Sequence, residues 1–325
     1  MTNRERFRRT FNFEPVDRLP IIEWAGWWDK TIARWHTEGL PENLQDAAAI
    51  RDYFDQDCHQ QMWIGPTRDR ANGPLPIKTR EDYLAHKPYL YPENAFDRDV
   101  VRQWAEKQKT GEMVVWLTLE GYFWYPRTLF GIEDHLYAFY DCPDLMKEMN
   151  EDLLAYNQRI YDEFCEICVP DFMTFAEDMS YNHGPMLSKG QFDEFMAPYY
   201  RRIVPTMLER GTVVIVDTDG DITEPAAWFL EVGCQGLLPL ERMAGVDVSE
   251  LRLRHPRIRL LGAFDKTTMH LGEARMRQEF ERLLPVMKQG GFIPSCDHQT
   301  PPGVSLEDYR LYMKLLKEYC ELAVK

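Results

Sequence analysis

Short apolar segments alternate along this chain with amphipathic helical patterns, and this alternation constrains the fold more than any other feature. A strand, a helix and a second strand in that order form the repeating unit of a parallel sheet. Continuous apolar runs are typical of strands buried on both faces. We expect seven such strands, at residues 19–24, 113–119, 171–176, 212–216, 236–240, 258–263 and 291–295.

The segments between these strands carry helix signals. Ser188 and Gln191 form a capping-box pattern, apolar residues follow at helical spacing, and Gly211 marks the helix end. Residues 66–110 contain several prolines and few apolar runs, so we expect an irregular insertion there. Because no Pro-, Gly- or Ser-rich boundary divides the chain, residues 1–325 are expected to form one α/β domain. A (β/α)8 TIM barrel, with an N-terminal extension, fits this length.

The overall charge and the cysteine pattern exclude several classes of protein. The net charge of -15 argues against a nucleic-acid partner and against binding to an anionic membrane. No segment approaches the length of a membrane span, and the basic N-terminus has no apolar secretory core. The seven cysteines are odd in number and scattered, which indicates free thiols in a reducing compartment. We therefore expect a cytoplasmic protein that acts on a small molecule.

Ionisable residues follow six of the seven expected strands. In a barrel, these strand ends meet at one rim, where the chemistry is found. Asp217 and Asp219 are two residues apart, so in extended backbone their side chains point the same way. With His298 they are candidate ligands for one metal ion. The alternative is that Asp217 caps the next helix and that His298 holds a loop by hydrogen bonding.

Aromatic residues follow the first expected strand. Trp27 and Trp28 could form the floor of a site for a flat organic ligand, although core packing explains most of the tryptophans in this region. Tyr122 follows the second strand and is a further candidate for the pocket wall. No glycine-rich nucleotide motif follows a strand, so a nucleotide cofactor is not indicated.

Several segments resemble the uroporphyrinogen decarboxylase superfamily. They are TNRERFRRTFNFEPVDRLPI, GPMLSKGQFDEFMAPYYRRI, VDTDGD, LPLE, GVDVSEL, LLGAFDK and GGFIPSCDHQTPPGVSLEDY. The pattern is closest to an uncharacterised branch marked by Asp-x-Asp-Gly. The resemblance runs almost end to end and independently implies a (β/α)8 barrel. It also makes a homodimer plausible.

The superfamily performs two chemistries. One branch removes carboxyl groups from a tetrapyrrole without a cofactor. The other consists of zinc-containing methyltransferases that work with a corrinoid protein and a thiol acceptor. True decarboxylases carry an N-terminal arginine motif, roughly RQAGRY, where this chain has GWWDKTIARW. Its absence argues against a porphyrin substrate, because such a polyanion needs paired cations, and Arg34 is the only nearby candidate.

The methyltransferases carry His-x-Cys-Gly where this chain has Asp217-Thr-Asp219-Gly. His298 stands at the offset of their third zinc ligand. The resemblance therefore implies a metal site in which carboxylates replace thiolates. Carboxylate oxygens are harder ligands than thiolates, so the preferred metal can change. Cys296 is an alternative ligand. Glu177 or Glu241 is expected to complete the coordination shell of the metal or to transfer protons.

Three functions follow. The first is a metal-dependent methyl or one-carbon transferase, with zinc as the expected metal, a corrinoid present only through a partner protein, and Asp178 and Lys266 as further substrate-binding candidates. The second is a metal-free decarboxylase or lyase that does not act on uroporphyrinogen. In it Asp219 stabilises a protonated intermediate and His298 polarises the substrate. The third is a non-catalytic barrel that binds a small ligand.

Overall fold

The computed structural model describes residues 1–66 and 77–325. Its main sheet has seven strands, all parallel, in the order β1-β2-β3-β6-β7-β8-β9. They are β1 (His59–Ile64), β2 (Val114–Glu120), β3 (Phe172–Ala176), β6 (Val213–Asp217), β7 (Gly236–Leu238), β8 (Arg259–Phe264) and β9 (Phe292–Cys296). Strands β4 (Ser180–Tyr181) and β5 (Gly184–Pro185) form a separate antiparallel hairpin. The predicted α/β class with a parallel sheet is confirmed.

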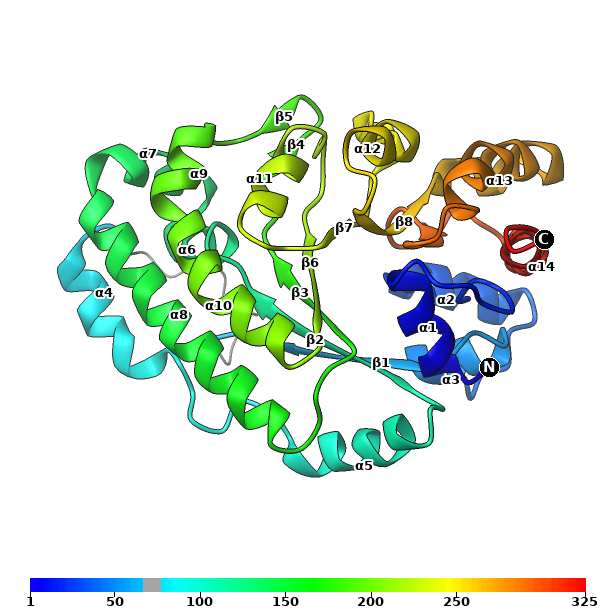
Figure 1. Cartoon of the computed structure of the whole chain (residues 1–325), viewed down its shortest axis with the longest axis horizontal. Helices are drawn as coiled ribbons and strands as arrows, with labels where there is room; N and C mark the ends of the chain where they lie inside the picture. Colours follow the sequence, from blue (N-terminus) through cyan, green and yellow to red (C-terminus); the bar gives the residue numbers. More distant parts are fainter. Residues whose placement is uncertain (67–76) are drawn as a thin grey trace.

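Helices surround this sheet. In Figure 1, α8 and α10 lie to the left of β3 and β6, α13 and α14 lie to the right of β8, and both chain ends are on the right. The α-helices are α1 (Asn3–Phe11), α2 (Asp29–Thr37), α3 (Ala47–Tyr53), α4 (Arg80–His86), α5 (Arg98–Lys109), α6 (Trp124–Phe130), α7 (Ile132–Asp141), α8 (Pro143–Cys165), α9 (Lys189–Phe195), α10 (Ala197–Glu209), α11 (Pro225–Glu231), α12 (Val248–Arg254), α13 (Glu273–Met287) and α14 (Leu306–Leu322). Short 3-10 helices are η1 (Lys87–Tyr89), η2 (Arg242–Ala244) and η3 (Lys266–Leu271). Within the described ranges, no helix is both long and apolar enough to cross a bilayer.

Six of the seven predicted strands are present, with ends shifted by one or two residues. The missed strand is β1, in which Gln60 and Gln61 interrupt the apolar run. The irregular insertion predicted at 66–110 is wrong for its later part, which contains α4, η1 and α5. Asp97 caps α5, and Val101 and Ala105 bury one of its faces. Residues 67–76 lie outside the described part of the chain.

The two faces of the sheet pack into separate cores. Alternate residues of β2, β3, β6, β7, β8 and β9 enter one small inner cluster, and the residues between them belong to the large core under the helices. Helix α1 adds Phe7 and Phe11 to the inner cluster, where both rings lie against Phe172. Strands at opposite ends of the sheet can share one cluster only if the sheet curls. Helix α1 therefore covers the inner face near the amino ends of the strands.

The prediction of a strand at residues 19–24 is wrong, because this segment forms no hydrogen-bonded strand of the sheet. It nevertheless has a defined place between the two edge strands. The Asp57 N–H, just before β1, donates to the Ile21 carbonyl at 2.8 Å. On the β9 side, the Trp24 N–H donates to Ser295 Oγ at 3.4 Å and the Cys296 N–H donates to Glu23 Oε1 at 3.3 Å. Hydrogen bonds to side chains thus take the place of most of the backbone hydrogen bonds that a strand in this position would make. The structure shows a curled seven-stranded sheet bridged by this segment, and the expected closed eight-stranded barrel is not confirmed.

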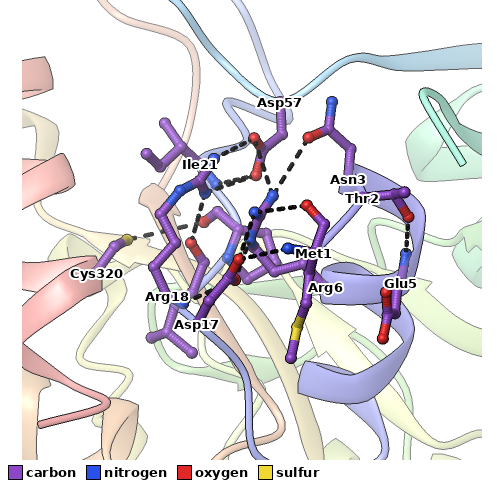
Figure 2. Close-up of polar contacts among 12 residues, drawn as sticks. Met1, Thr2, Asn3, Glu5, Arg6, Asp17, Arg18, Ile21, Asp57 and Cys320 are labelled. Carbon is purple, nitrogen blue, oxygen red and sulfur yellow. Dashed lines mark hydrogen bonds and ion pairs between the residues drawn. The ribbon is translucent and has the colours of Figure 1, made fainter.

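A buried carboxylate anchors this bridging segment. Asp57 is 4% exposed and accepts hydrogen bonds from Arg18 Nη1 at 2.8 Å and Nη2 at 2.6 Å. It also accepts the Ile21 N–H at 3.0 Å, and Arg6 approaches it at 3.6 Å. Figure 2 shows Asp57 facing Ile21 and both arginines, with Asp17 on the other side of Arg6. A two-pronged arginine bond fixes direction as well as distance, so Asp57 sets where residues 18–21 enter the seam.

We expect Asp57→Asn to lower the free energy of unfolding by about 2–3 kcal/mol, because it leaves the partly buried Arg18 guanidinium without its counter-charge. Urea denaturation would measure this loss. The matched control is Asp55→Asn, since the Asp55 side chain is 92% exposed and contacts only Lys317 among the described ion pairs. The control should unfold like the parent protein. Equal stability of the two variants would contradict the anchoring role.

Candidate active site

A cavity of about 390 Å³ lies at the carboxyl ends of the strands. It is lined by Trp24, Ala25, Gln61, Trp63, Asp178, Asp217, Asp219, His298 and Gln299. This is the end of a parallel α/β sheet at which ligands bind, and the volume is typical of small-molecule sites. A hollow of about 640 Å³ beside α1 lies at the opposite end, where such enzymes do not carry their chemistry. The structure therefore brings Asp217, Asp219 and His298 to one cavity.

Three carboxylates share this cavity. Burial, together with the charges of Asp178 and Asp219, raises the pKa of Asp217 well above its usual value. No hydrogen bond to the Asp217 carboxylate occurs in the described part of the chain. Burial and then the charge of Asp219 raise the pKa of Asp178 to about 6, although Arg127, 3.8 Å away, opposes the shift. Like charges in a shared low-dielectric site favour the protonated form, so burial and the neighbouring carboxylates act on Asp217 in the same direction.

The imidazole of His298 faces Asp219. Its Nε2 lies 3.6 Å from Asp219 Oδ2, and its Nδ1 accepts the Gln299 N–H at 2.8 Å. An accepting Nδ1 leaves the ring proton of the neutral form on Nε2, directed to Asp219. Asp219 also raises the pKa of His298. The Trp24 ring meets the imidazole edge-on, at 6.0 Å between centroids. His298 is thus a polarised donor with a fixed tautomer.

The loop after β6 holds these carboxylates through bonds to neighbouring loops. The Thr218 N–H donates to the Leu238 carbonyl at 3.0 Å, and the Gly220 N–H donates to Glu241 Oε2 at 3.0 Å. Gly220 has φ +82°, and a Cβ there would lie 2.6 Å from the backbone nitrogen of Tyr181. Only glycine satisfies both conditions. The Asp-x-Asp-Gly sequence therefore joins a rigid turn to two cavity carboxylates.

Glu177 is not at the cavity. Its carboxylate lies on the outer side of the sheet and accepts the N–H groups of Tyr122, Phe123 and Trp124 at 2.8–3.1 Å, together with the hydroxyl of Tyr200. Burial raises its pKa to about 7, and these donors counteract the shift. Both carboxylate oxygens of Glu177 already accept hydrogen bonds, mostly from backbone N–H groups at the start of α6. We therefore assign Glu177 a structural role in place of the expected catalytic one.

Glu241 and Lys266 form a second layer behind the cavity. The Lys266 ammonium lies 3.2 Å from Asp297 Oδ1 and 3.7 Å from Glu241 Oε1. Asp297 is fully buried and also accepts the backbone N–H groups of Arg242 and Lys266. Neither Glu241 nor Lys266 lines the cavity. Lys266 thus pairs with two carboxylates, and Glu241 accepts the Gly220 N–H and so supports that turn. Neither residue makes the contact with substrate that the sequence led us to expect.

The aromatic residues of the cavity are not the expected ones. Trp27 is buried among other core rings, Trp28 is exposed at the start of α2, and Tyr122 stacks on a core tyrosine under the helices. The tryptophans that line the cavity are Trp24, in the bridging segment, and Trp63, in β1. Sequence reasoning missed them because it placed Trp24 inside a strand and did not find β1. The signal that could have indicated an aromatic wall is the cluster of tryptophans in the first part of the sequence.

The predicted metal ligands do not form a ligand set. Cys296 is fully buried, and its side chain belongs to the outer core, whereas Ile293 on the same strand belongs to the inner cluster. Across residues 1–66 and 77–325, no three His, Cys, Asp or Glu side chains are arranged to hold one metal ion. Among these described residues, the donor geometry therefore does not fit the expected metal.

We expect Asp217→Asn to stabilise the protein above pH 4. The pKa of Asp217 is raised in the folded chain, so folding keeps a proton that the unfolded chain, with a pKa near 4, releases. The parent protein consequently loses stability as the pH rises above about 4, by up to about 1.4 kcal/mol per pH unit, and the neutral amide does not. Urea denaturation at pH 4 and at pH 7.5 would measure the growing gap. Parallel pH profiles for parent and variant would refute the raised pKa of Asp217.

Comparisons with known proteins place the chain in a family. No curated protein sequence matches it. Solved structures that resemble it include a candidate vitamin-B12-independent methionine synthase from Listeria monocytogenes, with 9% identity, a TM-score of 0.43, and coverage of 95% of this chain and 97% of that chain. Fungal β-1,4-galactanases give 13% identity and a TM-score of 0.43, covering 90% of this chain and 99% of that chain. At these values, neither likeness informs the activity.

A family model matches much more specifically. The model described as uroporphyrinogen decarboxylase (URO-D) matches residues 128–319. This segment contains β3 and all the strands that follow it, together with Asp178, Asp217, Asp219 and His298 of the cavity. It covers more than half of the 325 residues. The protein therefore belongs to the uroporphyrinogen decarboxylase family.

Proposed function

We propose that this protein is an acid-catalysed, metal-independent decarboxylase or related lyase acting on a small organic substrate. The observation that carries the proposal is the position of Asp217. Burial and the neighbouring carboxylates raise its pKa, which favours the protonated form, and it faces the same 390 Å³ cavity as Asp219 and His298. A carboxylic acid held neutral at pH 7 is suited to deliver a proton inside a site.

The three residues then have separate tasks. Asp217 donates its proton to an electron-rich carbon of the substrate, and the positive charge that results lies opposite the Asp219 carboxylate. The bond from that carbon to the carboxylate breaks, its electron pair neutralises the cation, and CO2 leaves. Solvent then returns a proton to Asp217. The Nε2–H of His298, oriented by Asp219 and by the Gln299 N–H, polarises the substrate.

The cavity lining supports a substrate other than uroporphyrinogen. None of the described residues that line the cavity is Lys or Arg. Among the described residues, Arg127 is the arginine that pairs with a cavity carboxylate, and it is bound to the Asp178 carbonyl at 2.9 Å and stacked on Trp124 at 4.2 Å. A tetrapyrrole with many carboxylates needs several paired cations. This agrees with the missing N-terminal arginine motif.

Asp217→Asn and His298→Ala are each expected to lower kcat by about 10²–10⁴-fold. The assay is CO2 release from a panel of small carboxylic acids whose acidic carbon is electron-rich. Because Asp217 acts as an acid, kcat/KM should fall as the pH rises through its raised pKa. Glu42→Gln, an exposed carboxylate outside the cavity, is the activity control. Full turnover in Asp217→Asn would contradict the proposed role.

Metal-dependent methyl or one-carbon transfer, with a corrinoid partner protein, is the second candidate. The observation that favours it is that Asp178, Asp217, Asp219 and His298, all ligand types that divalent cations accept, face one cavity. Their described arrangement does not fit a metal ion, so the acid-catalysed reaction ranks first. A barrel that binds a small ligand without chemistry would show binding and no turnover with either reaction type.

Elemental analysis separates the two enzymatic candidates. We expect substoichiometric metal in protein purified with or without added zinc, and unchanged CO2 release after chelation, because three side chains do not converge on one point. The measurement is mass-spectrometric metal content per chain. One metal ion per chain in the parent protein, lost in Asp217→Asn and retained in the control Asp55→Asn, would instead establish the metal-dependent reading.

A further inference from the structure

A polar relay of four side chains crosses β1, β2 and β3 and ends at the cavity. Trp116 Nε1–H donates to Thr174 Oγ1 at 2.9 Å, and the hydroxyls of Thr174 and Thr118 share a hydrogen bond of 2.7 Å. Thr118 Oγ1 in turn accepts the side-chain amide of Gln61 at 2.9 Å. Both threonines are fully buried, and burying a hydroxyl is costly unless it is hydrogen-bonded. Each member of the relay therefore holds the next, and Gln61 is the member that lines the cavity.

The relay orients the carboxamide of Gln61 before any ligand binds. Gln61 lies within β1, so its side chain enters the cavity from a strand and not from a loop. One of its two amide N–H groups donates to Thr118, and its side chain makes no other hydrogen bond with the described residues. The second N–H is therefore available to a ligand. Because the amide is already held in place, little further side-chain entropy is lost on binding.

The other donors of the described cavity lining are less suited to hold a carboxylate. Both tryptophans of the cavity donate their indole N–H groups within the protein. The Nε2–H of His298 is directed to Asp219. Gln299 is exposed, so water competes for its amide. Gln61 thus offers a fixed, uncharged donor inside the cavity.

An uncharged donor suits a carboxylate that has to leave. A hydrogen bond from an amide N–H stabilises a carboxylate, but a paired guanidinium holds it more strongly. The negative charge of the carboxylate disappears as CO2 forms, so a strong ion pair would stabilise the substrate more than the transition state and slow the reaction. The described lining contains no Lys or Arg. Its three aspartates also disfavour a second carboxylate on the substrate.

We propose that the free amide N–H of Gln61 binds the carboxylate that is lost, and that the natural substrate is a small acid with a single carboxylate on a planar, unsaturated carbon. The carbon is unsaturated because Asp217 has to add a proton to it. This inference rests on the proposed function, since it names the substrate class of the same site. Sequence reasoning could not reach it, because it did not find β1.

Unreactive acids test the inference without turnover. Benzoate carries one carboxylate on a planar carbon, and its ring is not electron-rich, so it does not lose CO2. Benzamide has nearly the same shape without the charge, and isophthalate adds a second carboxylate. Isothermal titration calorimetry on the full chain should show benzoate binding at millimolar concentration. Isophthalate should bind at least about tenfold more weakly, because its second carboxylate meets the aspartates.

Matched variants locate the contact. Gln61→Met keeps the length of the side chain and should weaken benzoate binding by about tenfold but benzamide binding by about threefold at most, because a hydrogen bond to a charged group is the stronger one. Thr118→Val keeps Gln61 but removes its anchor, so the loss for benzoate should be smaller. Gln60→Met is the control, since Gln60 points to the opposite face of β1 and does not line the cavity. Thermal unfolding of each variant checks that the fold is kept, and Gln61→Glu, which places a negative charge at the same point, is the second test if Gln61→Met is unstable.

The binding results are separable from the test of catalysis. Equal effects of Gln61→Met on benzoate and benzamide, a loss caused by Gln60→Met instead, isophthalate binding as tight as that of benzoate, or no benzoate binding at millimolar concentration would overturn the carboxylate inference. Such a result would leave the proposed reaction to be decided by the CO2 assay. A selective loss in Gln61→Met combined with full turnover in Asp217→Asn would reject the proposed reaction and leave the carboxylate site standing.

Discussion

The pairing of Asp57 with Arg18 is the interaction on which the rest of the site depends. It directs residues 19–24 into the space between β1 and β9, whose outer edges have no strand partner in the described chain. That segment carries Trp24 to the cavity, and it lies between the strand bearing Trp63 and the strand that leads to His298. If the segment moved, the sheet edges could separate, and these three side chains would no longer face one another.

The cavity concentrates negative charge at a cost to stability. Asp178 adopts φ +41°, which is unusual for a residue with a side chain, and accepts the Asp219 N–H at 3.4 Å. The loops after β3, β6 and β7 are joined to one another by such bonds, so the carboxylates cannot move apart. Strain and like-charge repulsion held by rigid loops are typical of functional sites. The same crowding raises the pKa of Asp217.

Sequence reasoning located the cavity through the rule that chemistry follows the strands. It found Asp217, Asp219 and His298 because each follows a strongly apolar strand whose end is clear from the pattern. It misplaced Glu177 because successive residues point to opposite faces, and one residue decides between the cavity, where Asp178 lies, and the outer core. The glutamines of β1 hid that strand and with it Gln61 and Trp63.

The sequence by itself determined the α/β class, six of the strands and the residues that meet at the rim, because these follow from local periodicity and from the rule that parallel strands end at one edge. Tertiary structure alone decided the rest. Whether the sheet closes, which tryptophans face the cavity and which carboxyl groups have a raised pKa depend on contacts between residues far apart in the chain. Asp57 with Arg18, and Asp217 with Asp178, are examples. Burial and mutual repulsion arise only when those residues are brought together.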